Sequence, residues 1–199
     1  MADQDLGYLS RLYAGSDDPW RIENGFYEQR KRRLVLDCLP QPRYRSCFEP
    51  GCAAGALSEL LAERCDRLLA ADAADRAVEL TAARLAGHRH AEARRLAVPD
   101  GWPAGRFDLV VLSEFGYYLP PDRWQELVER LAGSLAEGWT VLACHWLSPF
   151  AERTIATDEL HEALAAGLPG RRVVLLRDED FRLDVFTGVP GSVAARDGR

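Results

Sequence analysis

The sequence lacks the features that mark exported, membrane and metal-binding proteins. No uninterrupted apolar run approaches the roughly 20 residues that cross a bilayer, and the acidic, polar start after Met1 is unlike a secretory signal. The five cysteines include no C-x-x-C pair, which favours buried free thiols over a disulfide or a metal site. We therefore expect a cytoplasmic protein that binds no membrane and no metal.

The chain is also short of basic charge and of repetition. Its net charge of -6 argues against a nucleic-acid partner, which needs a basic face, and Lys31 is its only lysine. No internal repeat or low-complexity block is present, and 47% hydrophobic with 28% charged residues is an ordinary globular composition. With 199 residues we expect one domain, as a monomer or a homodimer. Within it we expect a helical lid (residues 1–44), the main domain (45–190) and a flexible tail (191–199).

The apolar pattern alternates between strand-like and helix-like segments. The run from Phe107 to Ser113 is apolar on both faces, as in a strand inside a parallel sheet. This order predicts an α/β, Rossmann-like fold: a mostly parallel seven-stranded sheet with a C-terminal antiparallel hairpin strand and helices on both faces. Its ligand crevice should lie at the carboxyl ends of the early strands. The expected strands are residues 45–49, 67–72, 90–97, 107–113, 139–145, 172–177 and 181–187; the expected helices are 26–39, 56–64, 75–85, 121–135 and 157–165.

A glycine-containing turn follows the first expected strand. Gly51 permits a sharp turn and a close ligand, Ala53 is nearly as small, and Gly55 allows the next helix to pack closely. Such a turn can also join a strand to a helix without binding anything. Its neighbours decide between these interpretations.

Two acids flank this turn. Asp72 ends the second strand, where a carboxylate can accept hydrogen bonds from both hydroxyls of a ribose, and we expect Asp75 to cap the next helix and leave Asp72 free. Glu49 precedes the turn and would repel a pyrophosphate, and the third glycine of a dinucleotide motif is missing. A cationic ligand without phosphate fits better. S-Adenosylmethionine, with its sulfonium and ammonium groups, is such a ligand.

The pattern from Glu49 to Asp72 resembles the cofactor motif of class I methyltransferases. Three further segments, residues 18–28, 49–55 and 113–119, are similar to the nodulation protein S family, bacterial enzymes that N-methylate an amino sugar in a chitooligosaccharide. The resemblance covers roughly Asp18 to Thr187. It implies a class I methyltransferase fold, S-adenosylmethionine as cofactor with S-adenosylhomocysteine as product, and methylation of a small amine.

The resemblance also suggests which residues contact the cofactor. Relatives carry an acid after the third strand, near the adenine amino group, but this chain has Ala97 and Val98, so backbone groups there would have to recognise adenine. An N-terminal segment often closes over the cofactor in methyltransferases, and Trp20 and Tyr27 are the expected lid residues, although Trp20 could equally be a hydrophobic plug. The full expected cofactor set is Glu49, Gly51, Cys52, Ala53, Gly55, Asp72, Ala97, Val98, Ser113, Trp20 and Tyr27.

The acceptor should lie beside the later strand ends. An amine must lose a proton before it can attack the methyl group, and we expect Glu114 and His145 to position and deprotonate it. Tyr117, Tyr118 and His161 are the expected acceptor contacts, since aromatic faces attract cations. Each candidate has a structural alternative. Glu114 could be a surface acid, Tyr117 and Tyr118 could be core aromatics, and His145 could be a structural histidine.

The favoured hypothesis is an N-methyltransferase acting on an amine such as an amino sugar or a natural-product intermediate. O-Methylation of a small-molecule hydroxyl is the first alternative. An NAD-dependent oxidoreductase and a non-catalytic cofactor-binding protein are the others.

Overall fold

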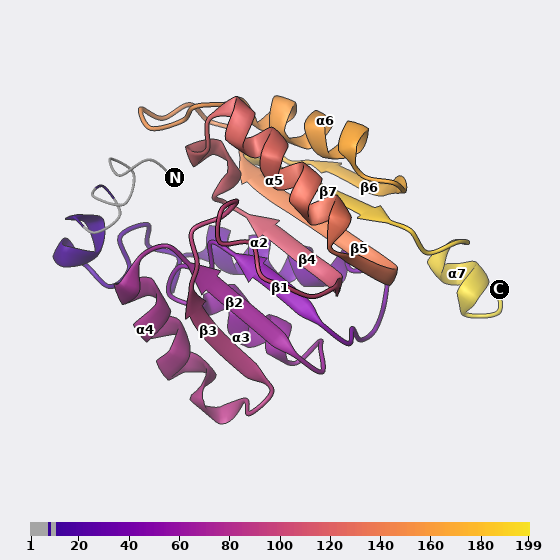
Figure 1. Ribbon diagram of the computed structural model, residues 1–199, viewed down its shortest axis with the longest axis horizontal. Coiled ribbons are helices and arrows are strands. Elements are labelled where there is room, and N and C mark those ends of the chain that lie inside the picture. Colours follow the sequence, from indigo (N-terminus) through magenta and orange to yellow (C-terminus); the bar gives the residue numbers. More distant parts are fainter. Residues whose placement is uncertain (1–7, 9–10) are drawn as a thin grey trace.

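A seven-stranded sheet forms the centre of the computed structural model, which describes residue 8 and residues 11–199 (Figure 1). The strands lie in the order β3-β2-β1-β4-β5-β7-β6. Strands β1 to β5 run parallel to their neighbours in this group, whereas β7 is antiparallel to both β5 and β6. The predicted fold class is therefore confirmed. The strands are β1 (Cys47–Pro50), β2 (Leu68–Asp72), β3 (Ala91–Arg95), β4 (Phe107–Ser113), β5 (Leu135–Trp146), β6 (Arg171–Arg177) and β7 (Phe181–Thr187).

Helices cover both faces of the sheet (Figure 1). Helix α5 begins at Pro121, whose ring suits a first helical position, and buries Trp124, Leu127 and Leu131 at helical spacing. Together with α6 it covers one face, while α2 and α3 cover the other. The α-helices with defined bounds are α2 (Phe26–Asp37), α3 (Ala56–Ala62), α4 (Asp75–Arg84), α5 (Pro121–Gly133), α6 (Thr157–Gly167) and α7 (Val193–Arg196), and two short 3-10 turns are η1 (Leu85–Gly87) and η2 (Gly116–Tyr118).

Alternation along the central strands builds two apolar cores. In β4, Val110 and Leu112 pack toward α5 and α6, whereas Leu109 and Val111 pack toward α2 and α3. Because successive side chains of a strand point to opposite faces, a strand buried on both faces must be apolar throughout. This is why Phe107–Ser113 could be recognised from its composition.

Most element boundaries differ from the prediction by up to two residues, and two segments differ more. Strand β5 begins at Leu135, four residues earlier than expected, because Leu135 already pairs with Phe107 of β4; the pairing with β7 begins only at Thr140. The expected flexible tail contains the short helix α7, in which Ser192 Oγ accepts a hydrogen bond from the Ala195 N–H at 3.1 Å. Within the described residues, no helix has the length and apolar character that crossing a membrane requires.

Candidate active site

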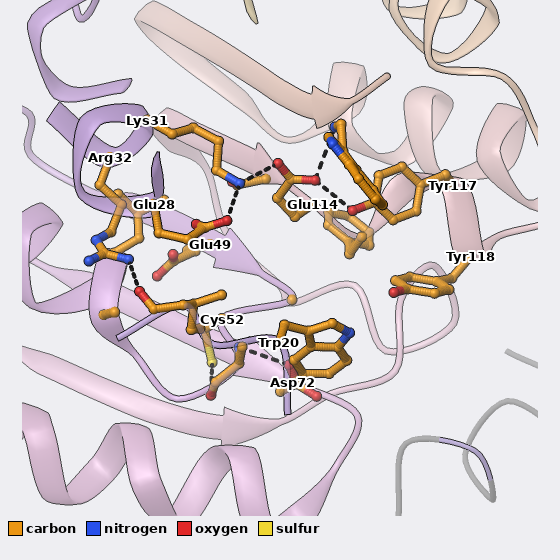
Figure 2. Close-up of a pocket in the computed structure, with 18 of the residues that line it drawn as sticks. Trp20, Glu28, Lys31, Arg32, Glu49, Cys52, Asp72, Glu114, Tyr117 and Tyr118 are labelled. Atoms are coloured by element: carbon orange, nitrogen blue, oxygen red, sulfur yellow. Dashed lines mark hydrogen bonds and ion pairs between the residues drawn. The ribbon is translucent and has the colours of Figure 1, made fainter. Parts of the chain in front are cut away.

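A cavity of about 960 Å³ opens at the carboxyl ends of the parallel strands, bounded on one side by α2 (Figure 2). A cavity at this edge is typical of ligand sites in open α/β sheets. Most of the residues expected to contact cofactor or acceptor line it: Trp20, Tyr27, Glu49, Gly51, Cys52, Ala53, Asp72, Val98, Ser113, Glu114, Tyr117 and Tyr118. Four do not: Gly55, Ala97, His145 and His161.

The turn after β1 forms one wall of the cavity. Gly51 has a φ of 74°, and a Cβ built on it would lie 2.8 Å from the Phe115 Cβ. Ala53 also has a positive φ, of 50°, and its N–H donates to Asp72 Oδ2 at 3.0 Å. The backbone is thus held in a conformation that side chains disfavour, with Gly51 placed where nothing larger fits.

Asp72 binds both the turn and the next helix. Its Oδ1 accepts the Ala74 N–H at 2.9 Å, and Ala74 is the residue that precedes α4. The expectation that Asp75 caps this helix is wrong, since Asp75 is its first residue and the N-cap has no side-chain hydrogen bond of its own. Burial raises the pKa of Asp72. Hydrogen bonds from backbone N–H groups, including those of Ala74 and Ala53, partly oppose this rise. A carboxylate offers about four acceptor positions, so these two bonds leave capacity for a ligand.

Glu49 is the second acid of this wall, and it is 2% exposed. Its Oε2 accepts a hydrogen bond of 2.5 Å from Ser58 Oγ. Burial raises its pKa to about 8; the Ser58 bond opposes this rise, and the nearby Asp72 carboxylate adds to it. A cationic ligand group beside Glu49 would favour its ionised form, whereas a phosphate would not.

Gly55 and Ala97 serve the fold around this wall. Gly55 is the N-cap of α3 with a φ of 78°, and a Cβ there would meet Thr81 Oγ1 of α4 at 2.9 Å, so its small size lets these helices meet. The Ala97 carbonyl accepts the Gly101 N–H at 2.8 Å. Neither residue lines the cavity, so the expected contacts of Gly55 and Ala97 with a cofactor stay predictions. Leu96 and Val98, on either side of Ala97, line the cavity instead.

Glu114 occupies the centre of the opposite wall, directly after β4. It has a φ of 60°, an uncommon conformation for a residue with a side chain. Its Oε2 accepts the Tyr117 hydroxyl at 2.5 Å and the Trp146 N–H at 3.0 Å, and its Oε1 accepts from Lys31 Nζ at 2.7 Å. Strained residues cluster at functional sites, and this one presents an anchored carboxylate to the cavity.

Lys31 was missed by the sequence analysis as a site residue. Figure 2 shows its ammonium between the carboxylates of Glu28, at 2.9 Å, and Glu114. It also lies 4.9 Å from the centre of the Tyr27 ring. Burial alone would lower the pKa of Lys31, but the two carboxylates outweigh it and hold that pKa above its ordinary value. The one signal that could have revealed it is that the chain's only lysine lies among arginines on a helix next to the site.

Hydrogen bonds hold residues 18–23, which precede α2, beside the cavity. Arg32 donates to the carbonyls of Ile22 and, at 3.2 Å, of Glu23. Asp18 Oδ1 accepts the Ile22 N–H at 2.8 Å. Trp20 lies between these anchors, with its ring 5.7 Å from that of Tyr13, and it lines the cavity.

Both histidines lie behind the cavity wall: neither His145, which was expected to face the crevice, nor His161, which was expected to contact the acceptor, lines the cavity. His145 and His161 are fully buried. In β5 the neighbouring Trp146 lines the cavity and points toward the α2 side, so alternation turns His145 toward α5 and α6. Burial lowers the pKa of both imidazoles, assisted at His145 by nearby positive charge.

Curated relatives of this chain are nodulation proteins S. It is 36% identical over 105 residues to the protein of Rhizobium tropici, and these residues make up 52% of this chain and 44% of the relative. It is 35% identical over 118 residues to that of Bradyrhizobium diazoefficiens (strain USDA 110), and the aligned region covers 59% of this chain and 56% of the relative. The chain thus spans about half the length of the curated relatives it matches.

Solved structures agree in fold. A Pseudomonas syringae protein described as a proposed methyltransferase is 42% identical with a TM-score of 0.73, over 82% of this chain and 99% of the other. The N-methyltransferase NodS of Bradyrhizobium japonicum WM9, in complex with S-adenosylhomocysteine, has a TM-score of 0.82 at 24% identity, over 93% and 98% of the two chains. Residues 4–143 also match the family model described as Nodulation protein S (NodS). This match spans well over half of the sequence, and the chain therefore belongs to the nodulation protein S family.

Proposed function

We propose that this chain is an S-adenosylmethionine-dependent methyltransferase that methylates the nitrogen of a small-molecule amine, such as an amino sugar or a natural-product intermediate. One observation carries the proposal. A single cavity joins the acid-flanked turn of Glu49 and Asp72 to an acidic and aromatic wall formed by Glu114, Tyr117 and Tyr118. The first wall suits a cationic cofactor and the second suits an amine.

The residues of the first wall fit S-adenosylmethionine. Gly51 lines the cavity without a side chain, so its backbone is accessible to a ligand. Asp72 has acceptor capacity for ribose hydroxyls, and Glu49 supplies negative charge for an ammonium group. A pyrophosphate carries no positive group that could pair with Glu49 and would be repelled by its ionised form, which disfavours NAD.

The second wall supports the chemistry of the acceptor. When bound, the cofactor supplies a sulfonium methyl group that is transferred in line to the amine nitrogen. The Tyr117 and Tyr118 rings and the Glu114 carboxylate attract and orient a cationic amine. The amine must give up a proton to attack, and the Glu114 carboxylate is the residue of this wall that receives it.

We also propose that residues 1–44 act as a lid on the domain formed by residues 45–190. The part of this lid that the structure describes supplies Glu28, Lys31 and Arg32 to the cavity and holds Trp20 across its mouth. Exclusion of water by such a cover favours methyl transfer to the acceptor. A cytoplasmic location is part of the proposal, supported by five free cysteines.

The first test is calorimetric titration of the purified chain with S-adenosylhomocysteine, with NAD as the control ligand. We expect a dissociation constant of about 1–100 μM for the first and no detectable binding of NAD. Failure to bind S-adenosylhomocysteine would end the methyltransferase proposal.

The second test offers S-adenosylmethionine with a panel of amines that includes glucosamine, with matched sugars lacking the amino group as controls. Mass spectrometric fragmentation of the product locates the added methyl group. We expect it on nitrogen. A methyl group found on a hydroxyl oxygen would move the proposal to O-methylation.

A further inference from the structure

A line of buried polar groups lies directly behind the acceptor wall. It runs from Asp184 in β7 through His161 in α6 and His145 in β5 to the backbone N–H of Gly116 in η2. His161 Nδ1 lies 3.3 Å from Asp184 Oδ2, His145 Nδ1 lies 3.1 Å from His161 Nε2, and the Gly116 N–H donates to His145 Nε2 at 3.3 Å. The three side chains are fully shielded from solvent. The mechanism proposed above uses none of them.

The position of each proton on the two imidazoles follows from the donor at one end of the line, the Gly116 N–H. A backbone N–H can only donate, so His145 Nε2 must be unprotonated and its proton must reside on Nδ1. That Nδ1–H then donates to His161 Nε2, which must also be unprotonated, and the proton of His161 faces the Asp184 carboxylate from Nδ1. One direction of donation therefore runs from Gly116 through His145 to His161, whose Nδ1 lies 3.3 Å from Asp184 Oδ2, and each imidazole must be neutral.

The charges around the line favour these neutral imidazoles. Asp184 Oδ2 accepts a hydrogen bond from Arg182 Nη2 at 2.9 Å and forms an ion pair with Arg172, whose Nε lies 3.2 Å away, so its negative charge is neutralised by groups other than His161. On the opposite side, the Arg153 guanidinium lies 5.2 Å from the centre of the Tyr117 ring, which itself packs edge-on against His145. A second proton on either imidazole would be buried and would face positive charge, which is costly.

The line ends on the segment that carries the acceptor wall. Gly116 separates Glu114 from Tyr117, and a Cβ on Gly116 would lie 2.9 Å from His145 Nε2 and 2.7 Å from Trp124 Cζ3. The Gly116 backbone therefore packs directly against the His145 imidazole. Thr154 holds the far end of the same segment through hydrogen bonds to the Tyr117 carbonyl.

We propose that His145 and His161 are positioning residues: as a neutral relay anchored on Asp184, they hold the Gly116 N–H and thereby fix Glu114 and Tyr117 for the acceptor. This role rests on the proposed methyltransferase function, but the relay itself does not. The relay acts through the backbone and touches no reacting atom. It also explains why a fully buried pair of histidines lies beside an otherwise apolar core.

The relay is tested first by nitrogen NMR of the wild-type chain labelled with ¹⁵N-histidine, between about pH 6 and 8. We expect His145 and His161 to remain neutral with the proton on Nδ1, while His88 and His90, which lie outside the relay, provide reference signals in the same spectra. A proton on Nε2 of His145, or a doubly protonated ring for either buried histidine at neutral pH, would overturn the relay. This measurement needs no substrate, so it stands even if the proposed function fails.

The positioning role is tested by His145→Leu, compared with His145→Gln, whose side-chain oxygen can still accept the Gly116 N–H. We expect hydrogen exchange at the Gly116 amide to be faster by about tenfold in the leucine variant and close to wild type in the glutamine variant. With glucosamine as acceptor, KM for the amine should rise by about tenfold in the leucine variant only, while affinity for S-adenosylhomocysteine changes by less than about twofold. His88→Leu is the surface control.

The outcomes separate the possible failures. Equal exchange at Gly116 in all variants would show that the imidazole does not hold this amide. Faster exchange together with an equal loss of cofactor affinity and acceptor affinity would show a general structural role and overturn positioning. Absence of S-adenosylhomocysteine binding in the wild type would instead remove the proposed function and leave the relay to the NMR result.

Discussion

At the scale of single residues, Glu49 couples proton binding to both folding and ligand binding. Its folded pKa of about 8 lies above its ordinary value of 4.5, so the folded protein holds this proton more tightly than the unfolded chain. The associated stability is complete below about pH 4.5 and is lost as the pH rises through about 8, with a maximum of about 5 kcal/mol. We expect the free energy of unfolding of Glu49→Gln to vary less with pH over this interval.

Thermal and urea unfolding at several pH values check this prediction, with Glu63→Gln, an exposed acid directly after α3, as the control. The affinity for S-adenosylhomocysteine should change in the opposite direction and rise with pH, because its ammonium group favours the ionised carboxylate. Parallel stability profiles for wild type and Glu49→Gln would show that Glu49 does not titrate in this range.

At the scale of elements, an ion cluster around the buried Lys31 joins α2 to the end of β4. Lys31 Nζ contacts Glu28 and Glu114, and the lysine side chain is only 6% exposed. Removing one member of a buried charge cluster leaves the others unpaired, so Lys31→Met should lower the free energy of unfolding by about 3 kcal/mol. Because the double variant Lys31→Met/Glu114→Gln removes one unpaired charge, it should recover about 1 kcal/mol or more.

Urea unfolding measures both values, and Arg33→Met, at an exposed position of the same helix, should stay within about 0.5 kcal/mol of wild type. If Lys31→Met were as stable as Arg33→Met, the cluster would not hold α2 to the sheet. If the two substitutions were additive, Lys31 and Glu114 would be energetically independent in spite of their 2.7 Å contact.

At the scale of the whole molecule, helix α2 and the sheet share one core. Val35 and Leu39, from α2 and the residues just after it, belong to the same buried cluster as Leu61, Leu68 and Leu109. We therefore expect a single unfolding transition. S-Adenosylhomocysteine at about 100 times its dissociation constant should add about 2.7 kcal/mol and raise Tm by about 5–10 °C.

Scanning calorimetry with and without the ligand checks this expectation, with NAD at the same concentration as the control. Two separate transitions would show that α2 folds independently of the sheet. An equal rise in Tm with NAD would show that the cavity does not discriminate against pyrophosphate.

Much of the fold was determined by local features of the sequence. Helices and strands have short periods, so patterns among neighbouring residues predict them. Such patterns identified strand β4 by its continuous apolar run, the boundaries of elements by prolines and glycines, and the final pair of strands. The turn at Gly51 and the acids Glu49 and Asp72 were identified for the same reason, since a strand end, a turn and a helix start are adjacent in the chain. The family resemblance depended on these same segments and is confirmed by the match over residues 4–143.

Only the tertiary structure decided which side chains at the strand ends reach the cavity. His145 and Trp146 are neighbours in sequence, but the pairing of β5 with β4 and β7 turns the first toward α6 and the second toward the site. Lys31 meets Glu114 across 83 positions of sequence, a contact that no local pattern contains. A one-residue change in strand register reverses every such assignment. Local periodicity therefore determines that a site lies at this edge of the sheet, and long-range packing selects the residues that form it.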